Sequence, residues 1–289
     1  MEPRARLVVI IAAHNEAGTV GAQLDALTSQ PCPVDVRFVV VDNNSTDDTV
    51  GVVRSRAEHD ERITLLAAHD GVGAGYARNA GAARTESEWI AFCDADDVVA
   101  DTWLGAIATA LETHAFVAGP LEVERLNEPW VAGSRGSSLS TGMSVFEETF
   151  PIASSCNLGI HRDTFDAVSG FDETFRYGQD TELSMRLWQA GVELHFVPEA
   201  LVHYRYRASM RAIFGQSRRF GAAHPRLIAR LRAAGTTVDN RSSEWRRWLW
   251  LARSVPTVFN RAGRARWLWV AGRQIGVTQG WWSVRRGAS

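Results

Sequence analysis

Four short apolar runs in the first hundred residues restrict the fold of this 289-residue chain more than any other feature. Each run is rich in branched or aromatic residues and ends in a polar or Gly-containing turn. The runs cover residues 7–13, 37–41, 63–67 and 89–93. Apolar residues at helical spacing follow the first two runs, with Thr19 and Asp47 as the expected helix caps. This alternation predicts βαβ units, and therefore an α/β fold with a largely parallel central sheet.

Polar turns follow three of the four runs. They read Ala13-His14-Asn15-Glu16, Asp42-Asn43-Asn44-Ser45 and Asp94-Ala95-Asp96-Asp97. In open α/β sheets, ligands bind beyond the carboxyl ends of the strands. The three turns are therefore expected to converge on one ligand-binding cleft.

Three carboxylates, those of Asp94, Asp96 and Asp97, stand in the third of these turns. Carboxylates crowded this closely repel one another, so each needs a cation, a hydrogen-bond donor or water. A hard divalent ion with oxygen ligands fits, and such an ion keeps coordination positions open for nucleotide phosphates. The alternative is that Asp97 or Asp101 caps the helix that begins near Trp103. This pattern alone leaves a metal site and a helix cap open.

Composition narrows the class of protein further. Cys32, Cys93 and Cys156 are widely separated and lack CxxC spacing, which argues against a disulfide framework and a thiolate zinc site. We therefore expect a reduced, cytoplasmic protein. The first apolar run is too short to cross a membrane and lacks a cleavage signal, so it is expected to be a buried strand. The chain has no Lys, which excludes mechanisms that need a Schiff-base or Walker-type lysine.

The middle of the chain is less regular. Residues 119–150 are Gly- and Ser-rich and predict a mobile loop or irregular strands, either a lid over the cleft or a plain surface loop. A strand over residues 155–160 and a short helix from Asp163 are expected next. Leu183 and Leu187 then mark a further helix, and residues 192–197 and 200–206 are expected to form strands.

The last 85 residues are basic and aromatic. Residues 205–289 hold 18 Arg against Asp239 and Glu244, whereas the preceding part of the chain is acidic. We expect one helix that Pro225 interrupts, and another with Trp245 and Trp248 on one face. Trp and Arg on amphipathic helices suit an anionic membrane surface, and the alternative is packing on the catalytic domain or in a homodimer. Nothing resembles a base-reading module, so no nucleic-acid partner is expected.

Six motifs, taken in order, resemble those of the family 2 glycosyltransferases, which have the GT-A fold. The resemblance covers residues 7 to about 205. The motifs are Val8-Val9-Ile10-Ile11-Ala12-Ala13-His14-Asn15-Glu16, Val39-Val40-Val41-Asp42-Asn43-Asn44-Ser45-Thr46-Asp47, Gly73-Ala74-Gly75-Tyr76-Ala77-Arg78-Asn79-Ala80-Gly81, Cys93-Asp94-Ala95-Asp96-Asp97, Gly170-Phe171-Asp172-Glu173 and Gly178-Gln179-Asp180-Thr181-Glu182.

The resemblance implies a nucleotide-diphospho-sugar donor site built from the first four motifs. The implied donor-binding residues are Ala13, Asn15, Glu16, Asp42, Asn44, Gly73, Arg78, Asp94, Ala95 and Asp96. Glu16 and Asp42 are expected to contact the nucleoside, with turn and cap roles as their alternative. Arg78 either meets the diphosphate through paired hydrogen bonds or is a solvated helix arginine.

The metal implied by the resemblance is Mg²⁺ or Mn²⁺. Asp96 is expected to bind the ion directly, with Asp94 near the ribose or the ion and Asp97 in support. His203 occupies a position at which some relatives place a histidine close to the metal, and an imidazole ligand favours Mn²⁺. A structural histidine at a strand end is the alternative for His203.

Asp180 is the expected catalytic base, because an attacking hydroxyl must lose its proton as the new bond forms. A helix N-cap is the structural alternative for Asp180, and Glu182 is the second candidate for the base. The family commonly has Glu-Asp where this chain has Gln179-Asp180. This chain therefore lacks the first acidic residue of that pair.

The expected protein is therefore an inverting, metal-dependent glycosyltransferase. Residues 1–205 would form the catalytic domain, with a donor half of about 1–118 and an acceptor half of about 119–205. Residues 206–289 would form a helical extension.

A UDP-sugar is the favoured donor, GDP- and dTDP-sugars are alternatives, and the acceptor is a glycan, a lipid-linked sugar or a small molecule. A scaffold protein without turnover and a sugar nucleotidyltransferase are the rival functions. The expected place is the cytoplasm or the inner face of the membrane.

Overall fold

The structure, a computed structural model, describes residues 5–135, 142–238 and 241–287. The chain divides into two compact units. We call the first the sheet unit; it comprises Met1–Glu122, Ser138–Ser144 and Phe150–Arg205. The second, the helical unit, comprises Val123–Ser137, Val145–Thr149 and Tyr206–Ser289. Two segments before residue 150 thus group with the C-terminal helices.

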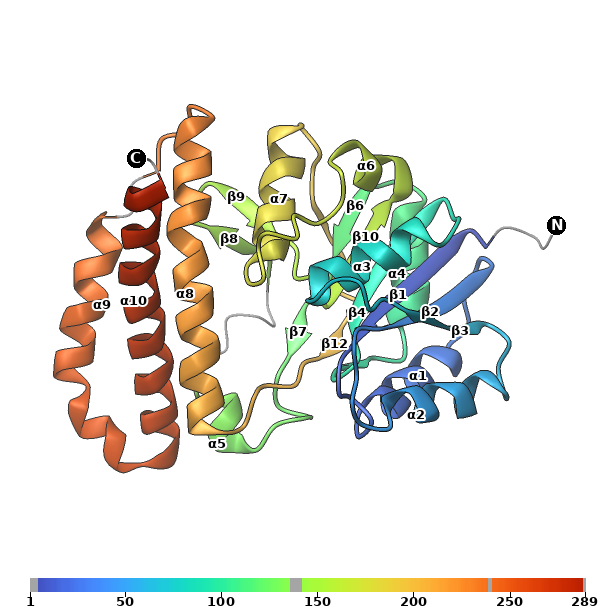
Figure 1. Ribbon diagram of the computed structural model, residues 1–289, viewed down its shortest axis with the longest axis horizontal. Helices are drawn as coiled ribbons and strands as arrows, with labels where there is room; N and C mark the ends of the chain where they lie inside the picture. Colours follow the sequence, from blue (N-terminus) through green and yellow to red (C-terminus); the bar gives the residue numbers. More distant parts are fainter. Residues whose placement is uncertain (1–4, 136–141, 239–240, 288–289) are drawn as a thin grey trace. The chain divides into compact units, whose positions relative to one another are not determined.

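Figure 1 labels the strands and helices in chain order. The strands are β1 (Leu7–Ala13), β2 (Val36–Asp42), β3 (Ile63–Ala67), β4 (Trp89–Asp94), β5 (Val98–Val99), β6 (Phe116–Ala118), β7 (Leu121–Glu122), β8 (Ser144–Phe146), β9 (Phe150–Ile152), β10 (Asn157–His161), β11 (His195–Phe196) and β12 (Val202–His203). The helices of the sheet unit are α1 (Val20–Thr28), α2 (Thr49–Ala57), α3 (Ala74–Ala83), α4 (Trp103–Leu111), α6 (Arg162–Ala167) and α7 (Gln179–Gln189).

The central sheet has seven strands in the order β11-β6-β10-β4-β1-β2-β3, and β4, β1, β2 and β3 are all parallel. Alternate residues of β1 enter two different cores. Leu7, Val9 and Ile11 pack with α1 and α4, whereas Val8 and Ile10 pack with α3, α6 and α7. A strand covered on both faces must be apolar throughout, which explains the unbroken runs in the sequence. The predicted α/β fold with a mostly parallel sheet is confirmed.

One strand of the second half enters this sheet in the opposite direction. β10 is antiparallel to both β4 and β6, and its first residue, Asn157, pairs with Cys93 near the end of β4. The start of β10 therefore lies at the edge of the sheet where β1, β2 and β4 end. The strands expected over residues 192–197 and 200–206 are shorter than predicted, as β11 and β12.

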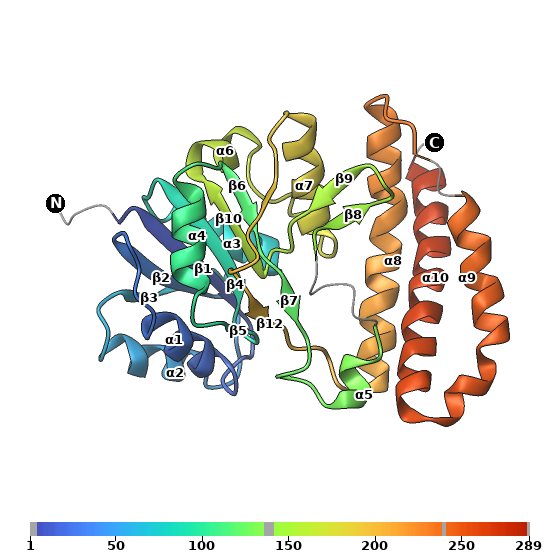
Figure 2. The ribbon, with the colours of Figure 1, turned by 180° about the vertical axis from the view of Figure 1, so that it is seen from behind.

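The helical unit contains α5 (Pro129–Ala132), α8 (Met210–Ala233), α9 (Arg241–Arg253), the 3₁₀ helix η1 (Val255–Phe259) and α10 (Arg261–Gly287). Figures 1 and 2 show α8, α9 and α10 running side by side. A Cβ atom on Gly221 of α8 would lie 2.1 Å from the carbonyl oxygen of Arg273 on α10. A Cβ on Gly276 of α10 would lie 2.0 Å from the carbonyl oxygen of Arg218. The two helices thus touch backbone to backbone.

The predicted interruption at Pro225 is wrong, since α8 is continuous through this residue. A proline inside a helix removes one backbone hydrogen bond and costs roughly 3 kcal/mol. The close packing of α8 on α10 opposes that cost, because Pro225 is buried and its ring lies beside Gly280, where an added Cβ would be 2.8 Å from Cγ. Tertiary contacts here outweigh local propensity.

Two further results concern the expected irregular and membrane-active segments. Residues 119–150, the expected irregular loop, contain β7, α5 and β8. Within this segment, residues 136–141 lie outside the described residues. Within the part of the chain that the structure describes, no helix has the length and apolar character needed to cross a bilayer.

Candidate active site

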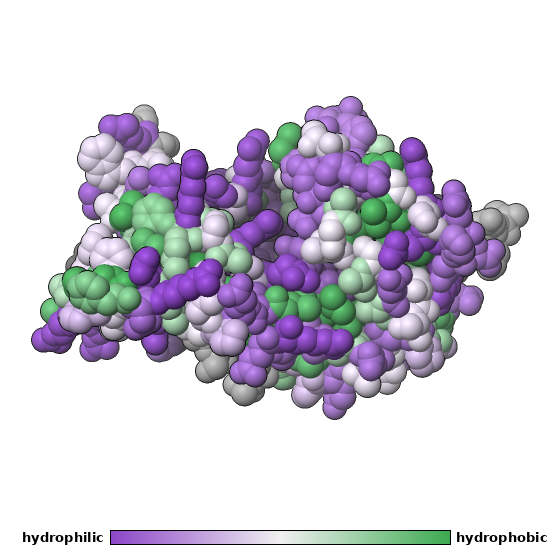
Figure 3. All heavy atoms as spheres, turned by 90° about the horizontal axis from the view of Figure 1, so that it is seen from below, coloured by the Kyte–Doolittle hydropathy of each residue, from purple (hydrophilic) through white to green (hydrophobic). Residues whose placement is uncertain are grey.

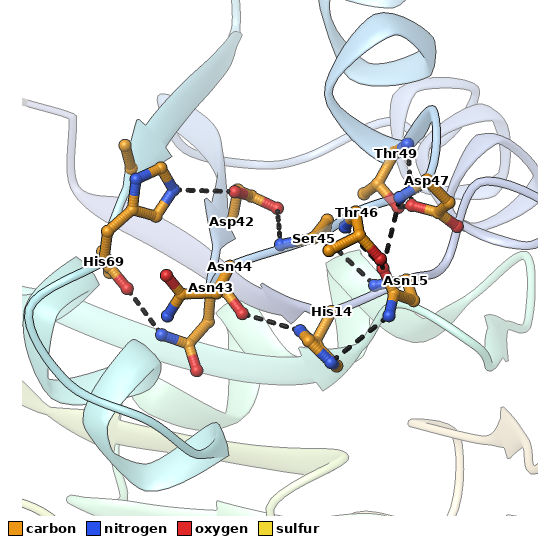
Figure 4. Close-up of polar contacts among 12 residues, drawn as sticks. His14, Asn15, Asp42, Asn43, Asn44, Ser45, Thr46, Asp47, Thr49 and His69 are labelled. Carbon is orange, nitrogen blue, oxygen red and sulfur yellow. Dashed lines mark hydrogen bonds and ion pairs between the residues drawn. The ribbon is translucent and has the colours of Figure 1, made fainter.

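Hydrogen bonds join the loops that follow β1 and β2 (Figure 4). Nδ1 of His14 lies 2.7 Å from the carbonyl oxygen of Asn43. Asn15 has a φ of 59°, a left-handed conformation that Asn tolerates well, and its N–H donates to Oγ of Ser45 at 3.0 Å. Its Oδ1 accepts from the N–H of Thr46 at 2.7 Å. The sequence prediction that these two turns meet is therefore correct.

Asp42 ends β2 with its side chain only 4% exposed. Its Oδ1 accepts from the N–H of Ser45 at 3.3 Å, and its Oδ2 lies 2.9 Å from Nε2 of His69, whose side chain is 55% exposed. Figure 4 shows His69 and Ser45 on either side of this carboxylate. His69 was missed in the sequence, although it stands just beyond the end of β3, a position that favours ligand contact.

The carboxylate of Glu16 is hydrogen-bonded to a nearby residue: its Oε2 accepts from Oγ1 of Thr19 at 2.9 Å. The main chain of the same loop is also held, since the N–H of Glu16 donates to Oγ1 of Thr49 at 2.8 Å. Glu16 and Asp42 thus both make the turn contacts considered as their alternative roles. These contacts fix each carboxylate at the edge of the sheet.

The turn before α3 depends on Gly73. Its φ of 117° lies in a region that side-chain-bearing residues rarely adopt, and its N–H donates to Oδ1 of Asn43 at 2.9 Å. Asn43 also donates from Nδ2 to the carbonyl oxygens of Ala68 and Gly71, the latter at 2.9 Å. Asn43 therefore ties the end of β2 to the start of α3.

Arg78, on α3, is only 2% exposed and forms an ion pair with Oδ1 of Asp94. Its guanidinium carbon lies 5.5 Å from the centre of the Phe171 ring. Nε and Nη1 are buried and have no hydrogen-bond partner within the described residues. The alternative of a solvated helix arginine is wrong, because α3 packs this face onto the sheet. Two buried guanidinium nitrogens thus remain available to an anion.

The acidic turn contains one deeply buried carboxyl group, that of Asp97. Asp97 is 1% exposed; its Oδ1 accepts from the N–H of Arg205 at 2.7 Å, and its Oδ2 has no partner among the described residues. Burial, reinforced by the charges of Asp96 and Asp94, raises the pKa of the Asp97 carboxyl well above its usual range. The helix-cap alternative is wrong, because α4 begins after Thr102 without a side-chain cap, and Asp97 bonds Arg205 instead.

A divalent ion fits this turn chemically. Ligand atoms of Asp94, Asp97 and Cys156 lie within 4.8 Å of one another. Burial raises the pKa of the Cys156 thiol well above its usual range, and the two aspartates supply oxygen ligands. An ion with oxygen ligands would satisfy the buried Oδ2 of Asp97 and offset the crowded negative charge. Asp96, the expected main ligand, lies outside this group, and its carbonyl oxygen accepts from Nε of Arg205 at 2.8 Å.

His203 lies on β12 opposite Val98, one residue beyond the acidic turn. Its Nδ1 is 2.6 Å from Oε2 of Glu122, and its side chain is 11% exposed. His203 is not a member of the Asp94, Asp97 and Cys156 group.

Asp180 lies within the first turn of α7, after Gly178, so the N-cap alternative is wrong. Its Oδ1 accepts from the N–H of Thr181 at 2.8 Å. Burial raises the pKa of the Asp180 carboxyl, and the charge of Arg78 opposes that rise. A carboxylate with a raised pKa is a stronger base. Glu182, the second candidate, is fully buried and accepts from Arg186 at 2.7 Å, which makes it a structural residue.

The third and fifth motifs contact each other through α3. Asn79 exchanges hydrogen bonds with the backbone of Phe171, at 2.8 Å from its Nδ2 and 2.9 Å to its Oδ1. A Cβ on Gly75 would lie 2.6 Å from Oε1 of Gln179, the residue that departs from the family pattern. The third motif therefore positions the segments that contain Phe171 and Gln179.

Two further site residues, besides His69, escaped the sequence analysis. Gln23 of α1 is fully buried, donates to the carbonyl oxygen of Asp94 at 3.1 Å and accepts from the N–H of Val99 at 2.9 Å. Arg205 bonds both Asp96 and Asp97. A signal for Gln23 was present in the sequence, because this polar residue stands beside Leu24, which belongs to the apolar face of the helix. Arg205 offered none, because the contact spans more than a hundred residues.

Comparison with known proteins gives a consistent result. The profile described as Glycosyl transferase family 2 matches residues 8–168, and that of Glycosyl transferase family group 2 matches residues 89–284. The succinoglycan biosynthesis protein ExoA of Rhizobium meliloti is 25% identical over 246 residues, which cover 78% of this chain and 71% of that protein. Several other curated relatives are longer, and the chain spans about half of their length.

Solved structures share the fold. The mannosyltransferase PcManGT from Pyrobaculum calidifontis, in complex with GDP-Man and Mn²⁺, aligns with a TM-score of 0.63 and 19% identity over 98% of this chain and 88% of its own. S. aureus TarS 1-349 in complex with UDP-GlcNAc aligns with a TM-score of 0.58 and 14% identity over 98% of this chain and 92% of its own. These alignments confirm the expected GT-A architecture.

Proposed function

The chain belongs to glycosyl transferase family 2, and on that premise we propose that it transfers a sugar from a nucleotide-diphospho-sugar to an acceptor hydroxyl, with inversion and with a divalent ion. The observation that carries the proposal is the arrangement of Arg78, Asp94 and Asp97 at the carboxyl edge of the sheet. It places buried guanidinium donors beside crowded carboxylates. A metal-bound diphosphate has the charges that complement both.

Donor binding is assigned to the loops after β1, β2 and β4 and to the start of α3. Asp42 and Glu16 would contact the nucleoside, with Asn15 and Asn44 shaping the loops, and Ala13 and Ala95 would line the site through their backbones. Gly73 leaves room for the backbone to approach the diphosphate. Arg78 would donate its unpartnered N–H groups to phosphate oxygens, since a guanidinium binds phosphate in paired hydrogen bonds.

Asp94 and Asp96 would hold Mg²⁺ or Mn²⁺, with Asp97 in support and His203 as a further candidate ligand. When bound, the ion would act as a Lewis acid for the leaving diphosphate. The fit rests on the unpartnered Oδ2 of Asp97 and on the hard oxygen donors of the turn. His203 would have to leave Glu122 in order to bind the ion through Nδ1.

Asp180 would take the proton from the acceptor hydroxyl as that oxygen attacks the anomeric carbon. The backbone N–H of Thr181 holds one carboxylate oxygen, which leaves the other for the acceptor. A base on the acceptor side supports direct displacement, and therefore inversion. The raised pKa of the Asp180 carboxyl increases its strength as a base.

The donor base and sugar are narrowed only by analogy with relatives of the same fold. PcManGT was solved with GDP-Man and TarS with UDP-GlcNAc. The test is a panel of UDP-, GDP- and dTDP-sugars, with Mn²⁺ or Mg²⁺, in which release of the nucleoside diphosphate is measured. Release from one donor, stimulated by metal and reduced in Arg78→Met, is the expected result. A folded protein that releases nothing from any donor contradicts the proposal.

The helical unit is proposed to meet an anionic membrane surface. An exposed apolar strip runs along α9 and η1, with Phe259 85% exposed; its other members are Trp245, Trp248, Leu249 and Val255. Residues 245–289 contain nine Arg and no Asp or Glu. Figure 3 shows hydrophobic surface at the η1 end of the unit with long hydrophilic side chains beside it. Exposed aromatic residues among arginines suit the interface of an anionic bilayer.

Vesicle co-sedimentation tests this second proposal. The double variant Trp248→Ser and Phe259→Ser should lose binding to phosphatidylglycerol vesicles, whereas Val145→Ser, which alters a residue 55% exposed elsewhere in the helical unit, should keep it. Equal binding by both variants would contradict the proposal. A dimer that the double variant abolishes would assign the strip to a second copy of the chain instead.

A further inference from the structure

A hollow of about 250 Å³ lies within the helical unit, between α9 and α10. Its lining residues are Arg247, Trp250, Arg266, Trp269, Val270 and Arg273. Three of the six are arginines and two are tryptophans. The residues of the candidate active site take no part in it, because they all belong to the sheet unit.

Positive charge in this hollow exceeds the negative charge that faces it. Burial, reinforced by the charge of Arg247, lowers the pKa of Arg273 to about 10. Glu147 is the carboxylate that acts on Arg273, and its Oε1 is already 2.7 Å from Nε2 of His224. Asp239 and Glu244 lie outside the described side chains. The lining itself holds three arginines and no acidic side chain, and Glu147 acts on two of them, Arg247 and Arg273.

A hydrogen-bond donor is also left over. Nη1 of Arg247 is buried and has no partner among the described residues. A buried donor without a partner costs roughly 1–3 kcal/mol, and more when it is charged. Such a group is retained at little cost when a ligand satisfies it. The unpartnered Nη1 and the excess of positive charge independently indicate an anion.

The aromatic walls set the character of the site. The guanidinium carbon of Arg266 lies 5.6 Å from the ring centre of Trp250, and that of Arg135 lies 4.4 Å from the ring centre of Trp269. The attraction between a guanidinium group and the face of an indole ring helps to hold these arginine side chains in place. Apolar walls also strengthen any charge interaction inside the hollow. Arginine forks bind phosphate oxygens in pairs.

We propose that this hollow is a binding site for a phosphate group, separate from the donor site and held by Arg247, Arg266 and Arg273. The phosphate belongs either to a lipid headgroup or to a soluble phosphate or diphosphate ester, because both present the same oxygens. The site goes beyond the proposed sugar transfer, and it uses a different face of α9 from the exposed apolar strip.

The first experiment measures Tm of the full chain in sodium phosphate or pyrophosphate against sodium chloride at equal ionic strength. Phosphate should raise Tm in the wild type and in Arg253→Gln, an exposed control on α9, and should not raise it in Arg247→Gln. Without phosphate, Arg247→Gln should keep or raise Tm, because it removes an unpartnered buried donor. Arg266→Gln, at an exposed position, is a second variant that leaves the interior intact.

A phosphate-dependent rise of equal size in Arg247→Gln, Arg266→Gln and the wild type would overturn the proposal. The proposal would also be overturned by three results together: a lower Tm for Arg247→Gln in chloride, no effect of phosphate on the Tm of any protein, and no response of these variants in the vesicle measurement below.

The second experiment separates the two sources of phosphate. Quenching of tryptophan fluorescence is followed with phosphatidylglycerol vesicles, phosphatidylcholine vesicles and soluble pyrophosphate. A response to phosphatidylglycerol that Arg247→Gln loses and Arg253→Gln keeps assigns a lipid headgroup, and the same pattern with pyrophosphate alone assigns a soluble ester. No response to any probe overturns the proposal. The variant Trp248→Ser with Phe259→Ser distinguishes the sites, since it should keep the phosphate-dependent rise in Tm.

Discussion

The guanidinium of Arg78 on α3 forms an ion pair with Asp94 at the end of β4. Arg78 is buried there, with only 2% of the residue exposed. Asp94 is the less buried partner, with 29% of its side chain exposed. The pair thus joins two separate sequence motifs in one charged contact.

Asp94→Ala should therefore destabilise the protein, because it leaves a buried guanidinium without its carboxylate. Removing one partner of a buried pair costs about 3–5 kcal/mol. Urea unfolding measures the change, with the exposed Asp101→Ala as the matched control, for which about 0.5 kcal/mol or less is expected. Equal effects of the two variants would show that the pair contributes little.

Asp96→Ala should abolish metal-dependent binding of the donor. Calorimetry with Mn²⁺ and the preferred sugar nucleotide measures this, and addition of EDTA should reproduce the loss in the wild type. Asp101→Ala should bind the donor normally. An unchanged affinity in Asp96→Ala would remove Asp96 as a metal ligand and leave the Asp94, Asp97 and Cys156 group as the remaining candidate.

Asp180→Asn should keep donor binding and lose transfer by a factor of roughly 10² or more, because a positioned base contributes about that much. Since burial raises the pKa of the Asp180 carboxyl, the wild-type rate should start to fall on the acid side at a higher pH than for an ordinary aspartate. Asp163→Asn on α6 is the exposed control. Near-normal turnover by Asp180→Asn would rule it out as the base.

The stability of the helical unit should fall as pH drops below about 6.5, the ordinary value for histidine. Burial, the larger cause, lowers the pKa of His224, and nearby Arg273 and Arg247 reinforce this; the hydrogen bond from His224 lowers the pKa of Glu147. Both folded-state values lie below the unfolded ones, so the unfolded chain binds more protons and acid favours unfolding.

Thermal unfolding, followed by far-UV circular dichroism from about pH 7.5 to about pH 5, measures this dependence, because histidine titrates in that range. His224→Gln should flatten it, whereas the exposed His59→Gln should leave it unchanged. A slope that is the same in all three proteins would assign the acid sensitivity to other groups.

Gly221→Ala should destabilise the protein by about 1–3 kcal/mol, since its Cβ would collide with the backbone of α10. Gly215→Ala on the same helix is the matched control: its Cβ would meet only the end of the Arg219 side chain, at 3.6 Å. This control should gain up to about 1 kcal/mol from better helix propensity. Two losses of equal size would contradict the close contact of α8 with α10.

The sequence was sufficient for the elements whose pattern is local. Continuous apolar runs predicted β1 to β4 because both faces of those strands are buried. Pro225 misled the prediction, because packing on α10 compensates for the missing hydrogen bond. β11 and β12 were predicted too long, since their neighbours in the sheet end after two paired residues.

Site prediction failed where a contact joins distant segments. Asp97 seemed able to cap a helix, but its partner is the N–H of Arg205, 108 positions later in the chain. The turns after β1 and β2 were placed correctly, because parallel neighbouring strands must end at one edge. Arg78 could be assigned to the helix but not to its buried side, since helix spacing does not show which face an arginine occupies.

The reversed direction of β10 also has an evolutionary consequence. β1, β2 and β4 end at the edge of the sheet that carries the candidate site, whereas β10 begins there, at Asn157. The seven residues 150–156 therefore connect to the site without belonging to the seven-stranded sheet. Insertions or deletions near Phe150 can therefore be inherited without a change in the register in which β4 pairs with β10.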